Sequence, residues 1–107
     1  SFPTRRSSDQ AGLAKTLNNL AIVYRRAGRW EDARQNLEQA AAILSQSDDR
    51  TSLARVYNNL GLVLAAEGKQ REAAKYYQRA LALKEQLGDL YGMQITRMNL
   101  AQLNNPS

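Results

Sequence analysis

The sequence contains no cysteine and no histidine, and it has only two prolines in 107 residues. Without cysteine there is neither a disulfide framework nor a thiolate metal site. Without histidine the chain lacks the commonest general base and the commonest zinc ligand. No apolar run approaches the length of a membrane span, and no Gly-rich phosphate loop or catalytic constellation occurs. We therefore expect a protein that is not an enzyme, binds no metal and carries no cofactor.

The charge is only moderately one-sided, because 15 Lys and Arg stand against 10 Asp and Glu, which gives a formal net charge of +5. The basic residues are spread along the chain and interleaved with acidic ones, whereas a dense basic block would favour nucleic acid. We expect a protein or peptide partner and neither nucleic acid nor membrane. A cytoplasmic location is the working hypothesis. The apolar content is rich in Ala and Leu, which favours helix over sheet.

The first nine residues, Ser1 to Asp9, differ from the rest of the chain. They have no helical pattern and no initiating Met, and they resemble the in-frame translation of a common sequencing adapter. Such scars are excluded from fold reasoning. We expect residues 1–9 to be disordered and non-native, with the true N-terminus missing. The alternative, a disordered native tail, also predicts no fixed structure here.

A period of forty residues organises the remainder. Residues 14–53 align on residues 54–93 without a gap and with eleven identities, among them the Asn-Asn-Leu triplets that begin at Asn18 and Asn58. A third copy begins at Asn99. A fixed period of this length is typical of solenoid repeats. We assign one repeat to residues 10–53 and a second to residues 54–93, with the first helix of a truncated third repeat in residues 89–107.

Apolar stripes at helical spacing predict five helices. Their expected ranges are 10–27, from about 30 to 44, 50–67, 70–87 and 90–103. The expected inward stripes are Leu13, Leu17, Leu20 and Tyr24; Ala33, Leu37, Ala40 and Leu44; Leu53, Tyr57, Leu60 and Leu64; Ala73, Tyr77, Ala80 and Leu81; and Met93, Arg97, Leu100 and Asn104. Gly28 and Gly68 suit the left-handed position after a helix. Asp48 or Asp49 is expected to cap the third helix.

These residues resemble the tetratricopeptide repeat. The matching positions in the first unit are Leu17, Leu20, Ala21, Tyr24, Gly28, Ala33, Leu37 and Ala40. Those in the second unit are Tyr57, Leu60, Gly61, Leu64, Gly68, Ala73, Tyr77 and Ala80. The third unit begins with Arg97, Leu100 and Ala101. The resemblance implies an all-α solenoid of antiparallel helix pairs.

The repeat departs from the family's usual 34 residues, and Ser45 and Glu85 stand where a proline is common. The forty-residue length is similar to the subclass of kinesin-light-chain-like and bacterial signalling repeats. The family implies a scaffold that binds a peptide or partner domain on the concave face of the first helices of each pair. Asn18 and Ile22 stand where chaperone-tail-binding members carry a Lys and an Asn, so we expect no such binding.

The outward face of those helices is the candidate binding site. An asparagine recurs there in each unit, and its amide can pair with both polar groups of a peptide backbone. The expected peptide-binding residues are Lys15, Asn19, Ile22, Arg26, Arg55, Asn59, Leu62 and Asn99. The basic members favour acidic ligand side chains.

Two alternatives stay open. The recurrent asparagines can be solvated or bonded to a neighbouring helix, and for Asn18 and Asn58 bonding within the stack is the favoured interpretation. The segment can also serve mainly to self-associate, for instance as a homodimer through exposed terminal helices, or act as the regulatory part of a larger bacterial signalling protein.

Overall fold

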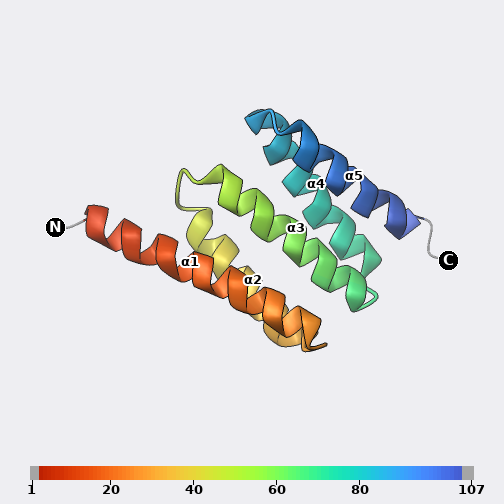
Figure 1. Cartoon of the computed structure of the whole chain (residues 1–107), viewed down its shortest axis with the longest axis horizontal. Coiled ribbons are helices and arrows are strands. Elements are labelled where there is room, and N and C mark those ends of the chain that lie inside the picture. The colour runs from red at the N-terminus through yellow and green to blue at the C-terminus, as the bar shows by residue number, and fades with distance from the viewer. Residues whose placement is uncertain (1–2, 105–107) are drawn as a thin grey trace.

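The computed structural model describes the backbone of residues 3–104 and the side chains of residues 9–103. Within these residues five helices follow one another through short turns. They are α1 (Pro3–Arg26), α2 (Trp30–Leu44), α3 (Arg50–Ala66), α4 (Gln70–Leu87) and α5 (Leu90–Asn104). Figure 1 shows them as a row of antiparallel pairs, with α5 starting a third pair beside α4. The predicted all-α solenoid is confirmed.

Glycines end the first helix of each complete pair. Gly28 and Gly68 have φ angles of 78° and 83°, which side chains with a β-carbon rarely adopt. The next residue turns its N–H back into the helix, so that Arg29 N donates to the Tyr24 carbonyl at 2.9 Å. Lys69 N donates to the Leu64 carbonyl at 2.8 Å in the same way. This is the Schellman arrangement, and it makes each pair antiparallel within three residues.

Alanine and leucine fill the contact between the helices. The predicted stripe of α2 is buried throughout, and most of the predicted residues of α3 and α4 are buried as well. The buried members are Ala33, Leu37, Ala40, Leu44, Leu53, Leu60, Leu64, Ala73, Tyr77 and Ala80. The small alanines let neighbouring helices approach closely. Helix α3 thereby packs against both α2 and α4 and forms the centre of the described structure.

The predicted inward stripe of α1 is wrong in part. Leu13 and Leu20 are 48% and 40% exposed, whereas their equivalents forty residues later, Leu53 and Leu60, are 9% and 0% exposed. The reason is that α2 covers this face of α3, and no described helix covers the same face of α1. The residues that α1 does bury are Ala14, Asn18 and Ala21.

The predicted stripe of α5 needs a similar correction. Arg97 is exposed, and its neighbour Thr96 is fully buried together with Met93. Met93 and Leu100 face inward as predicted, and between them Thr96 replaces Arg97, with hydrogen bonds to Lys84 and Asn58 on the neighbouring helices. The side chain of Asn104 lies outside the described residues.

The start of α1 also differs from the prediction. The helix begins at Pro3 instead of Gln10, so the expectation of no fixed structure in residues 3–9 is wrong. Proline is well tolerated in the first turn of a helix, and no further proline or glycine precedes Gly12. Ser1 and Phe2 lie outside the described residues. The foreign origin of this segment stays a prediction.

Candidate functional site

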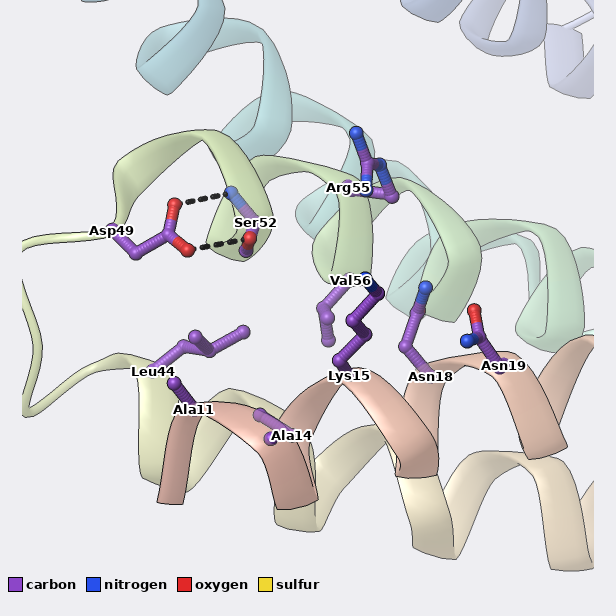
Figure 2. Close-up of a pocket in the computed structure, with 11 residues that line it drawn as sticks. Ala11, Ala14, Lys15, Asn18, Asn19, Leu44, Asp49, Ser52, Arg55 and Val56 are labelled. Atoms are coloured by element: carbon purple, nitrogen blue, oxygen red, sulfur yellow. Dashed lines mark hydrogen bonds between the residues drawn. The ribbon is translucent and has the colours of Figure 1, made fainter. Parts of the chain in front are cut away.

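A groove of about 410 Å³ runs between α1 and α3, the first helices of the two pairs. Its lining residues come from both helices, from the end of α2 and from the turn before α3. They are Ala11, Gly12, Ala14, Lys15, Asn18, Asn19, Leu44, Asp49, Ser52, Arg55 and Val56. Figure 2 shows Lys15 and Asn18 extending from α1 toward α3, with Arg55 rising from α3 at the rim. The groove thus brings together Lys15, Asn19 and Arg55 of the predicted site.

Two cations stand on the walls of this groove. Lys15 and Arg55 are exposed, and they occupy the same position of their repeats because they are forty residues apart. Neither forms an ion pair with another side chain in the described part of the chain. Both charges are therefore available to an acidic ligand. The floor beneath them is apolar, since Leu44 and Val56 are buried there.

The end of the groove near the α2–α3 turn carries an acid that is already bonded. Asp49 caps α3: its carboxylate accepts from the Ser52 backbone N–H at 3.0 Å and from the Ser52 hydroxyl at 2.6 Å. These bonds, the hydroxyl one foremost, hold the pKa of Asp49 below its ordinary value of 3.8. Asp49 is the cap that the sequence predicted, and it leaves the groove cationic in its middle and anionic at this end.

The recurrent asparagines bond from repeat to repeat. Asn59 Nδ2 donates to Asn18 Oδ1 at 2.9 Å, and Asn99 Nδ2 donates to Asn58 Oδ1 at 3.2 Å. Each bond joins the first helix of one pair to the first helix of the next. The interpretation that Asn18 and Asn58 bond within the stack is therefore confirmed. A peptide-binding role for the row of Asn19, Asn59 and Asn99 stays a prediction, with two of the three amides already donating to a neighbouring helix.

The other predicted residues lie away from this groove. Ile22 and Arg26 are farther along α1, where Ile22 is half-buried and Arg26 is exposed. Leu62 is half-buried on α3 and packs against the cluster around Tyr77. Neither these residues nor Asn59 and Asn99 line the groove, so the structure gathers three of the eight predicted residues there.

Sequence reasoning missed several lining residues. Asn18 was assigned to the stack alone, although it also faces the groove. Leu44 was predicted to be core, Val56 lay outside the predicted stripe of its helix, and Ser52 carried no signal because a serine in a first turn is common. The forty-residue period was the signal that could have identified these lining residues, since it relates the residues of one repeat to those of the next.

The described residues show neither a metal-binding cluster nor a membrane-spanning helix. No three acidic side chains gather there as metal ligands. Within the same residues, no helix combines the length and hydropathy needed to cross a membrane.

Helix pairs that repeat every forty residues and stack through equivalent faces define a helical solenoid protein. The model of one family, described as the tetratricopeptide repeat, matches residues 12–86. The chain belongs to the tetratricopeptide repeat family, whose domains are generally modules for protein–protein interaction. This family is typically non-catalytic. The comparison with curated proteins gives no match.

Proposed function

We propose that the groove between α1 and α3 binds an extended acidic segment of a partner protein. The observation that carries this proposal is the pair of exposed cations, Lys15 and Arg55, on the walls of a groove of about 410 Å³. Charge-assisted bonds from such cations to carboxylates are stronger than bonds between neutral groups. The apolar floor adds burial of a neighbouring side chain, and the Asn19 amide can pair with the peptide backbone.

The acidic preference follows from the charges that remain unbalanced. Asp49, bonded to Ser52 at one end, interacts electrostatically with Arg55, and its single negative charge leaves the groove with a net positive charge from Lys15 and Arg55. A ligand with its acidic residues at the centre matches this distribution. Because both cations are exposed, salt screens them, and binding should weaken as ionic strength rises.

Selection from a displayed library of random peptides on the immobilised full chain tests the proposal. We expect enrichment of Asp and Glu, and loss of the selected peptides from the variant Lys15→Glu/Arg55→Glu. The matched control is Lys69→Glu/Lys75→Glu, which changes the net charge equally at exposed positions outside the groove. Equal loss of binding in both variants would mean that only the net charge of the protein matters. Unchanged binding in Lys15→Glu/Arg55→Glu would show that the groove is not the binding site.

Self-association is the second candidate, and one observation favours it. Leu13, Leu20 and Val23 form an exposed apolar face on α1, although the equivalent face of α3 is buried against α2. The proposed occupant is a second copy of the chain, because the equivalent face of α3 packs against a helix of this same chain, α2. Sedimentation velocity at low micromolar concentration tests it. A dimer that Leu13→Glu abolishes and Gln35→Glu preserves supports this candidate, and a monomeric wild type rejects it.

A further inference from the structure

A second, smaller pocket of about 160 Å³ lies between α3 and the turn that leads into α5. Its lining residues are Thr51, Ala54, Arg55, Asn58, Lys84, Leu87 and Asp89. All except Leu87 stand forty residues after a residue of the first groove, namely after Ala11, Ala14, Lys15, Asn18, Leu44 and Asp49. The repeat therefore builds related pockets, one between α1 and α3 and one between α3, the end of α4 and the turn before α5.

The two copies differ at the floor. The first has Leu44 and Val56, which are apolar and buried. In the second pocket Lys84 takes the place of Leu44, and its Nζ donates at 2.8 Å to the Oγ1 of Thr96, the buried equivalent of Val56, which does not itself line the pocket. Lys84 Nζ also donates to the Gly92 carbonyl at 3.2 Å. The equivalent position is thus a buried leucine in the first repeat and a lysine in the second.

The charge of Lys84 is poorly compensated. Its two acceptors are neutral oxygens, and it forms no ion pair with any carboxylate among residues 9–103. The nearby acid is Asp89, one oxygen of which accepts from the Gly92 backbone N–H at 2.9 Å as the cap of α5. Burial lowers the pKa of Lys84, and the negative charge of Asp89 only opposes that effect. Lys84 is half-buried, and with Arg55 and Asp89 also in the lining the pocket carries a net positive charge, so it favours an added anion.

Arg55 connects the two pockets, because it lines both. It is exposed, and it adds a second positive charge to the wall of the second pocket. Asn58 contributes an amide at the same place, with its Oδ1 held by Thr96 at 3.3 Å and by Asn99 at 3.2 Å. Donors thus converge on the second pocket from both α3 and α4.

We propose that the second pocket is a carboxylate site, which takes an Asp or Glu side chain of the bound segment between Lys84 and Arg55. The first groove, with Leu44 in place of Lys84, takes an uncharged side chain at its floor. The inference rests on the proposed function for the source of the carboxylate. It adds a direction to binding, because the acidic residue must sit on the α5 side of an apolar one.

The variant Lys84→Leu/Thr96→Val tests this assignment, since it gives the second pocket the residues that the first already carries. The probe is N-acetyl-aspartate amide, titrated into the ¹⁵N-labelled full chain, with N-acetyl-asparagine amide as its uncharged match. We expect saturable shifts of the Gly92 amide with the aspartate probe only. Binding should weaken about tenfold in the variant, as expected for the loss of one charge-assisted bond. The Ser52 amide, the equivalent of Gly92 in the first groove, should respond equally in both proteins.

A second variant, Lys84→Gln, provides a test in case the double variant does not fold. It removes the positive charge and keeps a hydrogen-bonding group. It should weaken the aspartate probe as strongly as the double variant does. An equal response to both probes, or undiminished aspartate binding in Lys84→Gln, overturns the carboxylate site even if the selected peptides still bind the chain. Conversely, failure of the peptide selection with a positive aspartate titration rejects the proposed function and keeps the carboxylate site.

Discussion

The ring of Tyr77 lies directly against the Cα of Gly61, so that a β-carbon at position 61 would overlap the ring. The equivalent residues of the first repeat are Ala21 and Leu37, both buried. The same contact is therefore filled by an alanine and a leucine in the first repeat and by a smaller glycine and a larger tyrosine in the second. This exchange of volume explains why the chain departs from a strict repeat in its core.

Gly61→Ala should destabilise the protein by about 1–3 kcal/mol, because an added methyl group overpacks the contact with Tyr77. Adding Tyr77→Leu recreates the pair of the first repeat and should recover part of the loss. Chemical denaturation followed by circular dichroism measures both. Gly12→Ala is the matched control, since it adds the same methyl group to a helix with open space around it. That control should be neutral or stabilising by roughly 0.5–1 kcal/mol. A neutral Gly61→Ala would contradict the described contact.

Tyr77 should make the protein sensitive to alkaline pH. Burial raises the pKa of Tyr77 from 10.0 to about 12. Between these values the folded state keeps a proton that the unfolded state has released, so stability falls as the pH rises from 10 toward 12. Tyr77→Phe should flatten this part of the stability profile. Tyr91→Phe, at an exposed position, should leave it unchanged, and equal profiles for all three proteins would contradict the burial of Tyr77.

The bonds between asparagines should contribute measurably to stability. Asn59→Ala removes the donor to Asn18, which is only 6% exposed, and should cost about 1–3 kcal/mol. Asn99→Ala should cost less, because Asn58 keeps its bond from Thr96. Asn19→Ala, at an exposed position, is the control. Urea titrations that show equal, small effects for all three would favour a role in ligand binding alone.

The Asp49 cap predicts a dependence on acid pH. Asp49→Ala should lower the free energy of unfolding by about 0.5–2 kcal/mol near neutral pH. A carboxylate whose pKa is lowered in the folded state stabilises above its unfolded pKa and loses that contribution as the pH falls through the folded value. The difference from wild type should therefore shrink below about pH 4. Asp48→Ala, one residue earlier, should show neither effect. A difference that persists at low pH would mean that Asp49 acts through something other than its charge.

Most helix boundaries could be predicted from the sequence because local chemistry sets them. Gly28 and Gly68 end helices through their own backbone preference, and Asp49 starts one through its own side chain. The exposure of Leu13 could not be predicted, since it depends on whether another helix packs on α1. The start at Pro3 was missed because residues 3–9 have no apolar stripe that would indicate a helix.

The candidate site was predictable only in part. The repeat placed Lys15 and Arg55 on one face, since equivalent positions of a solenoid face the same way. It could not decide which of two adjacent asparagines turns inward, because neighbouring residues on a helix differ by 100° and the apolar stripe is wider than that. The positive charge of the second pocket could not be predicted either, because Lys84 stands at the position of the core residue Leu44. Its hydrogen bonds to Thr96 and Gly92, which the sequence does not reveal, accommodate the lysine there.

The most direct test of the proposed binding site is to map where a selected acidic peptide contacts the ¹⁵N-labelled chain of 107 residues. We predict that the largest amide shifts fall on the groove, at Lys15, Asn18, Asn19, Ser52 and Arg55, with those of α2 nearly unchanged. Shifts concentrated on the exposed face of Leu13, Leu20 and Val23 would contradict the account. They would make that face of α1, and not the groove, the binding surface.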